Sequence, residues 1–261
     1  IWVEPEMISE DSNLYHAHPD WVLCRPARTA TQSRTQLMLD LTRPEVCDYI
    51  IDTMTKLFSS ANISYVKWDM NRFMTEVGSS ADPKASAGAL AHRYMLSVYR
   101  MMDTLTSRFP KILFEGCAGG GGRFDPGTLY YFPQVWTSDD TDPVQRLTIQ
   151  GGASLAYPTS MMSCHVSASP NHQLGRLTTF ETRWNIAVLG GGFGYELDTT
   201  KLTPDERETV RQQIIQYKKE RGILFGSELY RLAAPKDTVA FQQTSKDKRH
   251  IVVACCRKLF D

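Results

Sequence analysis

The chain has 261 residues, enough for one large domain or for one domain and part of another, and 42% of them are hydrophobic, as in proteins with a buried core. Its 29 basic and 29 acidic residues cancel, which argues against binding to nucleic acid or to a membrane surface, because both favour a basic excess. No segment is apolar for long enough to span a bilayer. The six cysteines form neither a CxxC pair nor a zinc pattern, so we expect reduced thiols in an intracellular protein.

Both ends of the chain look interrupted. It begins without Met inside the strand-like run 1–3, and it ends at Asp261 directly after another strand-like run. We therefore expect a piece of a longer protein, whose N-terminal targeting signal would not be visible.

Short apolar runs typical of strands alternate with longer segments at helical spacing. This alternation predicts an α/β fold in which helices lie outside a parallel sheet. The number of units favours a (β/α)8 TIM barrel over a doubly wound sheet. The strand-like runs are 1–3, 36–40, 65–69, 112–117, 134–138, 154–162 and 186–189.

Three helices can be placed from caps and apolar stripes. Thr42 and Glu45 form a capping box for the first, and an apolar stripe over 94–105 marks the second. The third begins at Thr203 and is expected to end at Gly222.

The pattern changes after residue 226, where helical spacing stops. Short strands over 230–232, 239–243 and 251–255 predict the start of an antiparallel β-sandwich. We expect an N-terminally truncated barrel over residues 1–225 and the beginning of a C-terminal β domain, also truncated, over 226–261.

The end of the run 65–69 carries three polar groups. Alternation along a strand puts Lys67, Asp69 and Asn71 on one side, away from Trp68. At a barrel mouth these groups would bind a sugar, and the lysine would favour the ionised carboxylate that a nucleophile requires. A structural Lys–Asp pair at the barrel rim explains the same spacing equally well.

A second strand-end carboxylate, Asp139, has Asp140 and Asp142 as neighbours. Crowded like charges favour the protonated form of one carboxyl, as a general acid requires. Asp142 precedes Pro143 and is expected to cap a helix, so we assign the chemistry to Asp139. Two carboxylates from two strand ends are what glycoside hydrolysis uses.

The glycine-rich segment 115–123 lacks the endings of a phosphate-binding loop and of a dinucleotide fingerprint. Glycines let a backbone approach a sugar hydroxyl near Cys117 and Gly119, although a tight turn explains them equally. Trp2 can stack on a sugar ring, but a core tryptophan is the more frequent role. Arg34 can bind a hydroxyl or a carboxylate, with a surface salt bridge as the default.

A polar segment with two histidines, His165 and His172, follows the run 154–162. The sequence shows no third ligand at suitable spacing, so we expect loop structure here and no metal site. The glycines at 190–192 are assigned no role.

Together these motifs resemble the α-galactosidases of glycoside hydrolase family 36, over the whole chain and in order. The resemblance implies retaining hydrolysis of terminal α-galactosyl groups, as in melibiose, raffinose and stachyose, with no metal or organic cofactor. The segments that carry it are 2–7, 39–46, 67–72 (KWDMNR), 117–125 (CAGGGGRFD), 136–142 (WTSDDTD), 165–167 and 194–198.

The resemblance also implies residue roles. Asp69 matches the nucleophile and Asp139 the acid/base of the family. It further implies α-galactoside oligosaccharides as binding partners, a cytoplasmic location and, for the full-length protein, a homo-oligomer such as a tetramer. The residues that match the galactose subsite are Trp2, Arg34, Lys67, Asn71, Cys117 and Gly119.

The chain also departs from the family pattern. Family members carry a β-sandwich and two barrel strands before the segment that Ile1 resembles, so the resemblance implies a partial (β/α)8 TIM barrel of about strands three to eight. The second of those two strands carries an Asp-Asp-Gly-Trp segment that binds galactose hydroxyls and is absent here. We therefore expect the isolated chain to be weakly active or inactive, or to be a non-catalytic piece with residual carbohydrate binding. An α-N-acetylgalactosaminidase and a raffinose-synthase-like galactosyl transferase are the related alternatives.

Overall fold

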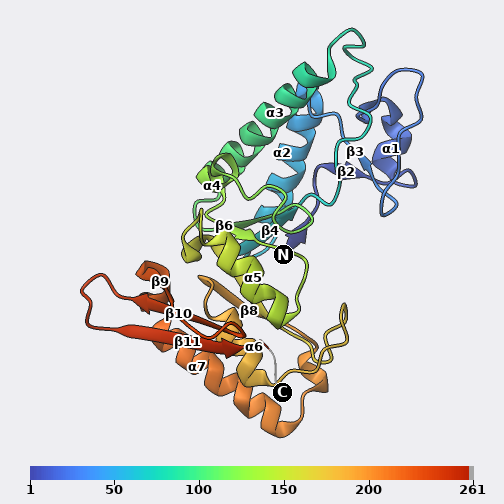
Figure 1. Cartoon of the computed structure of the whole chain (residues 1–261). Helices are drawn as coiled ribbons and strands as arrows, with labels where there is room; N and C mark the ends of the chain where they lie inside the picture. The colour runs from blue at the N-terminus through green and yellow to red at the C-terminus, as the bar shows by residue number, and fades with distance from the viewer. Residues whose placement is uncertain (259–261) are drawn as a thin grey trace. The chain divides into compact units, whose positions relative to one another are not determined.

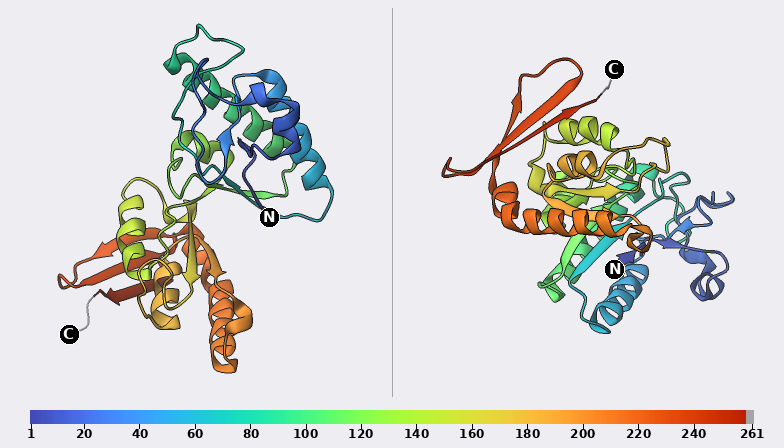
Figure 2. Two further views of the ribbon diagram at one scale, coloured as in Figure 1. Left: turned by 90° about the vertical axis from the view of Figure 1, so that its right-hand side faces the viewer. Right: turned by 90° about the horizontal axis from the view of Figure 1, so that it is seen from below.

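The computed structural model describes residues 1–258 and divides the chain into two compact units, Ile1–Pro133 and Gln134–Asp261 (Figures 1 and 2). Each unit contains three parallel strands with accompanying helices, and the second unit also contains an antiparallel sheet. The predicted α/β class with parallel strands is confirmed. The domain boundary at residue 226 stays a prediction, and residues 259–261 of the predicted C-terminal domain lie outside the described residues.

The parallel strands of the first unit follow the order β1 (Trp2–Val3), β4 (Tyr65–Asp69) and β5 (Leu113–Cys117). Their register places Asp69 opposite Cys117, and Lys67 opposite Trp2 on one side and Glu115 on the other. The polar groups at these strand ends are therefore neighbours. The other elements of this unit are α1 (Asn13–Ala17), the 3-10 turn Pro19–Trp21, β2 (Met7–Ile8), β3 (Leu37–Met38), α2 (Pro44–Ser59), α3 (Ala87–Arg108) and α4 (Pro126–Tyr131).

The core of the first unit lies between its strands and the helices α2 and α3. Val66 and Trp68 point into this core, so Lys67 and Asp69 point to the opposite face, as strand alternation predicts. The ring of Phe132 stacks on Phe114, with 5.3 Å between ring centres. The predicted apolar stripe of α3 is buried.

One carboxylate, that of Glu6, is fully buried in this core. Its Oε1 accepts hydrogen bonds from the indole of Trp68 (2.9 Å) and from Arg123 Nη1 (2.6 Å), and its Oε2 accepts from the Tyr94 hydroxyl (2.8 Å) and from Arg123 Nη2 (2.9 Å). Burial alone would raise the pKa of Glu6, but the charge of Arg123 and these hydrogen bonds hold it below the usual value. The pair ties the segment after β1 to β4, to α3 and to the glycine-rich loop.

The parallel strands of the second unit follow the order β6 (Gln134–Trp136), β7 (Met162–Ser167) and β8 (Gly192–Glu196). The predicted antiparallel strands are confirmed as β9 (Glu228–Leu232), β10 (Thr238–Thr244) and β11 (Ile251–Arg257), in the order β11-β10-β9. The remaining elements are α5 (Pro143–Ala153), α6 (Phe180–Ala187), α7 (Pro204–Gly226) and the 3-10 turns Thr159–Met161 and Thr199–Lys201.

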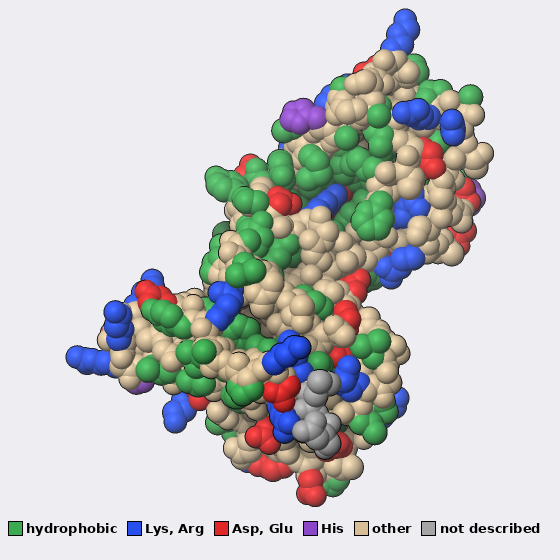
Figure 3. All heavy atoms as spheres, viewed as in Figure 1, with side chains coloured by type: hydrophobic (Ala, Val, Ile, Leu, Met, Phe, Trp, Pro, Cys, Tyr) green, Lys and Arg blue, Asp and Glu red, His purple; other side chains and the backbone are tan. Residues whose placement is uncertain are grey.

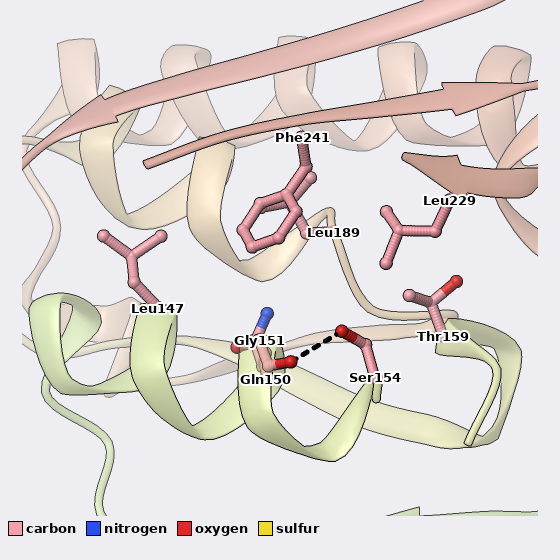
Figure 4. Close-up of a pocket in the computed structure, with 8 residues that line it drawn as sticks. All are labelled: Leu147, Gln150, Gly151, Ser154, Thr159, Leu189, Leu229 and Phe241. Carbon is pink, nitrogen blue, oxygen red and sulfur yellow. Dashed lines mark hydrogen bonds between the residues drawn. The ribbon is translucent and has the colours of Figure 1, made fainter. Parts of the chain in front are cut away.

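The antiparallel sheet packs against α5 through an apolar seam (Figure 4). Phe241 of β10 points toward Gly151 of α5, and Gln243 donates a hydrogen bond to the Leu189 carbonyl at 3.2 Å. The space left in the seam is about 10 Å³, about that of one water molecule. It is an interface between elements and too small for a substrate.

Two helix ends differ from the prediction. Arg43 is the N-cap of α2, without a side-chain hydrogen bond, so the capping box of Thr42 and Glu45 was wrong. The Thr42 hydroxyl instead donates to Asp40 Oδ1 at 2.6 Å, which removes it from the helix. Helix α7 begins after Thr203 as predicted, with a capping box that the structure adds, but it continues four residues past Gly222, a glycine that an exposed helix tolerates at a cost of about 1 kcal/mol.

Three predicted strands also differ from the structure. The run 36–40 gives only the short β3, which pairs antiparallel with β2 and does not join the parallel strands. The run 154–162 is mostly turn, and β7 covers the segment around His165 that was expected to be a loop. The run 186–189 is the end of α6, and the strand is β8.

Glycine-rich β8 is explained by its neighbours. A Cβ at Gly192 would lie 1.7 Å from the Gln134 side chain, and one at Gly194 would lie 3.1 Å from the ring of His165. The glycines leave room for both side chains, and their low strand propensity explains why the sequence did not reveal the strand.

No helix within residues 1–258 has the length and apolar character needed to cross a membrane. On the face shown in Figure 3, acidic and basic side chains are interspersed, in keeping with the balanced charge of the sequence.

Replacing Glu6 by Gln should destabilise the full-length protein by about 3–5 kcal/mol, because it leaves the Arg123 guanidinium buried without its counter-charge. Thermal unfolding measured by calorimetry checks this. Glu208→Gln, which breaks an exposed pair with Arg211 on α7, is the matched control and should change the unfolding temperature little.

The effect of Glu6→Gln should also depend on pH. Because the folded-state pKa of Glu6 is lowered, its contribution to stability is complete above the unfolded-state pKa, about 4.3, and is lost as the pH falls through the folded-state pKa. The difference in unfolding temperature between the parent and the variant should therefore narrow below about pH 4.3. A difference that stays constant on acidification would contradict the assigned charge state.

Candidate active site

Asp69 is the last residue of β4, and only 6% of its surface is exposed. Its Oδ1 accepts a hydrogen bond from the backbone N–H of Met70 at 2.9 Å, and its Oδ2 accepts from the indole N–H of Trp2 at 3.2 Å. Trp2 lies on the neighbouring strand and is 52% exposed. The carboxylate is thus held through both oxygens beside an aromatic ring that is open to a ligand.

Lys67 lies on the same face as Asp69, and its Nζ is 3.6 Å from Oε1 of Glu115 on β5. Glu115 is buried and also accepts a hydrogen bond from the Tyr65 hydroxyl. From the sequence, only Asp69 was expected as the partner of Lys67. The signal for Glu115 is its position in the glycine-rich segment, opposite Lys67 in the parallel register.

Asn71 is oriented by a residue that the sequence analysis missed. Its Nδ2 donates to Glu4 Oε1 at 2.6 Å, and Glu4 Oε2 accepts from Gln36 Nε2 at 2.9 Å. Because an ionised carboxylate only accepts hydrogen bonds, the amide nitrogen of Asn71 must face Glu4. The amide oxygen lies on the side of Gly119, 4.0 Å from where a Cβ of that residue would be.

The glycine-rich loop closes this cluster. Gly119 and Gly120 have φ angles of +57° and +81°, a left-handed conformation that side chains rarely adopt. Cys117, directly before the loop, is buried, and burial raises the pKa of its thiol. Lys67 opposes this shift, whereas the charge of Asp69 and a hydrogen bond to it add to the shift. The thiol is therefore a neutral donor to the candidate nucleophile.

The structure places Arg34 at an exposed hairpin tip. Ser33 and Gln36 exchange two backbone hydrogen bonds, and Arg34 and Thr35 both have positive φ angles, 54° and 60°, the pattern of a type I′ turn. Within residues 1–258 the guanidinium makes no hydrogen bond or ion pair. Hydrogen bonds through Gln36 and Glu4 link the hairpin to Asn71. Five of the six predicted subsite residues gather near Asp69, and Arg34 does not.

Asp139 lies in the second unit, three residues after β6, and is exposed. Its Oδ1 accepts a hydrogen bond from the indole N–H of Trp136 at 3.1 Å. The predicted cap is confirmed, since Asp142 Oδ1 accepts from the first backbone N–H groups of α5. Arg176 Nε lies 2.9 Å from Asp142 Oδ2, and this ion pair balances the negative charge of Asp142. Asp142 therefore adds less negative charge around Asp139 than expected.

His165 and His172, the two histidines of the predicted polar segment, do not form a metal centre. His165 stacks on Trp136, with 4.4 Å between ring centres. Among residues 1–258 no group of three or more His, Cys, Asp and Glu side chains is arranged to hold a metal ion.

Each unit thus presents one aspartate at or just after the carboxyl end of a parallel strand, where α/β barrels carry their catalytic groups. Residues 1–226 match the family model of melibiase. The chain belongs to the melibiase family. The resemblance of its motifs to family 36 α-galactosidases is thereby confirmed.

Relatives in this family are close in sequence. Over 99% of its length the chain is 54% identical to α-galactosidase AgaA of Geobacillus stearothermophilus, and over 97% it is 49% identical to the probable α-galactosidase G of Aspergillus terreus. These matches cover 36% and 34% of the relatives, so the chain spans about a third of their length.

Solved structures agree with the sequence matches. The crystal structure of AgaA superposes with a TM-score of 0.96 over 100% of this chain and 36% of that one, at 54% identity. The α-galactosidase of Lactobacillus brevis superposes at 0.95 over 98% of this chain and 35% of that one, at 46% identity. Variants of AgaA have been solved in complex with raffinose and with stachyose.

The state of Cys117 can be checked by alkylation. Because burial raises the pKa of its thiol and the thiolate is the reactive form, Cys117 in the folded full-length protein should resist iodoacetamide at pH 8, whereas exposed Cys255 should react. Peptide mass spectrometry measures both sites in one sample. Rapid labelling of Cys117 in the folded protein would contradict a buried, protonated thiol.

Proposed function

We propose that the full-length protein is a retaining exo-α-galactosidase that hydrolyses terminal α-galactosyl groups of melibiose- and raffinose-type oligosaccharides. The observation that carries this proposal is the pair of strand-end aspartates, Asp69 and Asp139, in a chain whose residues 1–226 match the melibiase family. The complexes of a 54% identical α-galactosidase with raffinose and stachyose support the substrate class.

The environments of the two carboxylates support different roles. Asp69 is buried and held through both oxygens, so it is fixed as the nucleophile that attacks the anomeric carbon. Asp139 is exposed, so the water that it must deprotonate in the second step can reach it. It first protonates the departing glycosidic oxygen and then removes a proton from the water that hydrolyses the galactosyl-enzyme.

The groups around Asp69 support a galactose subsite. Lys67 supplies an ammonium donor, Asn71 presents its amide oxygen as an acceptor, and Trp2 offers a ring face. Cys117 and Gly119 complete this wall, and Arg34 approaches on its hairpin in the full-length protein. Nothing in this mechanism requires a metal or an organic cofactor.

The proposal extends to the rest of the protein by family resemblance. The parallel strands would belong to a (β/α)8 barrel over residues 1–225, and β9 to β11 would begin a C-terminal β-sandwich. The same resemblance supports a cytoplasmic homo-oligomer, for which light scattering and cell fractionation are direct tests.

Substituting each aspartate in the full-length protein tests the assignment. Asp69→Ala should abolish turnover, and Asp139→Ala should slow melibiose hydrolysis by about 10²–10⁴, the usual contribution of a general acid. Asp52→Ala, an exposed aspartate on α2, is the matched control and should leave kcat unchanged. Near-normal activity of Asp69→Ala would refute the nucleophile assignment. In a crystal structure of the unsubstituted full-length protein, a distance of about 6.5–9.5 Å between the Asp69 and Asp139 carboxyls, instead of about 5–5.5 Å, would refute retention.

A further inference from the structure

The carboxylate of Asp139 has one side-chain contact in the described residues. Its Oδ1 accepts the indole N–H of Trp136 at 3.1 Å, and within residues 1–258 this is the only hydrogen bond that the carboxylate makes. Asp139 itself is exposed and lies outside a strand, in a segment whose backbone is held by Gln173 Nε2 on the Asp139 carbonyl at 2.9 Å. The orientation of this carboxylate therefore depends on the tryptophan.

Trp136 is itself held firmly. It ends β6 and is buried, and the ring of His165 on β7 stacks on it at 4.4 Å with an interplanar angle of 24°. Arg146 Cζ on α5 lies 4.4 Å from the centre of the Trp136 ring, a cation–π arrangement. Three elements thus fix one indole.

The two residues that pack on Trp136 are fixed in turn. Arg146 Nη1 donates to the Ser138 carbonyl at 2.9 Å, directly before Asp139, and Arg146 Nη2 donates to the Ser163 carbonyl at 3.1 Å. His165 Nδ1 lies 3.5 Å from Glu196 Oε2 at the end of β8. Gly194, opposite His165 in the β7–β8 register, leaves the space that the imidazole occupies.

We infer that Trp136, held by His165 and Arg146, is the positioning residue for the acid/base Asp139 and selects the oxygen that carries its proton. This inference rests on the proposed function. An indole N–H only donates, so Oδ1 of Asp139 accepts, and because a carbonyl oxygen accepts better than a hydroxyl oxygen, the acid form carries its proton on Oδ2. That proton passes from Oδ2 to the glycosidic oxygen as the anomeric C–O bond breaks, and a proton from water returns to Oδ2 as the galactosyl–Asp69 bond is hydrolysed.

Loss of the indole N–H leaves the carboxyl free to rotate and to carry its proton on either oxygen. This change should slow proton donation to the leaving group and should not weaken galactose binding. Hydrolysis of substrates whose leaving group needs protonation, such as melibiose, should slow. Hydrolysis of a dinitrophenyl α-galactoside should slow much less, because its leaving group departs as a stable anion.

The test uses Trp136→Phe in the full-length protein, which keeps an aromatic ring but removes the N–H. We expect kcat/KM for melibiose to fall about tenfold, which is within the range for losing one hydrogen bond. The value for dinitrophenyl α-galactoside should fall much less. His165→Ala, which removes the stacked ring, should also lower kcat/KM more for melibiose than for dinitrophenyl α-galactoside.

Trp184→Phe is the matched control. Trp184 is also buried in the second unit, on α6, but its indole N–H has no hydrogen-bond partner within residues 1–258. Trp184→Phe should leave the ratio of kcat/KM for melibiose to kcat/KM for dinitrophenyl α-galactoside unchanged. Equal losses of Trp136→Phe on both substrates, or no loss on either, would overturn the inference, because a purely structural tryptophan does not distinguish leaving groups.

Asp139→Ala separates failure of the inference from failure of the proposed function. If Asp139→Ala loses melibiose hydrolysis selectively and Trp136→Phe does not, Asp139 is the acid and only the positioning role is wrong. If Asp139→Ala itself fails to distinguish the substrates, the acid/base assignment is wrong as well.

Discussion

The buried ion pair between Glu6 and Arg123 is the constraint on which the first unit depends. It joins the segment after β1, the core tryptophan of β4, the helix α3 and the end of the glycine-rich loop. Such a pair adds little stability compared with well-packed apolar side chains, but it is costly to break from one side. The ion pair instead fixes the positions of two segments next to Asp69. One is the strand that carries Trp2, and the other is the loop that carries Gly119.

Each of the two candidate catalytic carboxylates accepts a hydrogen bond from a tryptophan indole, but the two differ in their exposure. Trp2 donates its indole N–H to Asp69, and Trp136 donates its indole N–H to Asp139. In the first case the carboxylate is buried and the tryptophan half-exposed, which suits a fixed nucleophile beside a sugar ring. In the second case the tryptophan is buried and the carboxylate exposed, which suits an acid that must recover its proton from water.

The sequence predicted those features that local rules decide. Strand alternation put Lys67 and Asp69 on one face, and the Asp142–Pro143 cap and the helix start at Thr203 are found as expected. Features set by distant neighbours were missed. The register that brings Glu115 to Lys67 becomes visible only once β4 and β5 are paired.

The same limit explains the wrong strands. The glycines of β8 leave room for the side chains of Gln134 and His165, so a strand of poor intrinsic propensity forms through its pairing with β7. His165 was expected in a loop because its segment is polar, yet β7 places it against Trp136. Glu4 carried no motif of its own, and its role follows from Asn71 and Gln36 reaching it from two other segments.

The central claim is that Asp69 forms the covalent bond to the sugar. The most direct measurement is mass spectrometry of peptides from the full-length protein after reaction with a fluorinated galactosyl trap, which forms the galactosyl-enzyme but hydrolyses slowly. The account predicts one added galactosyl group, on the peptide that contains Asp69. A label on a peptide that lacks Asp69 would contradict it.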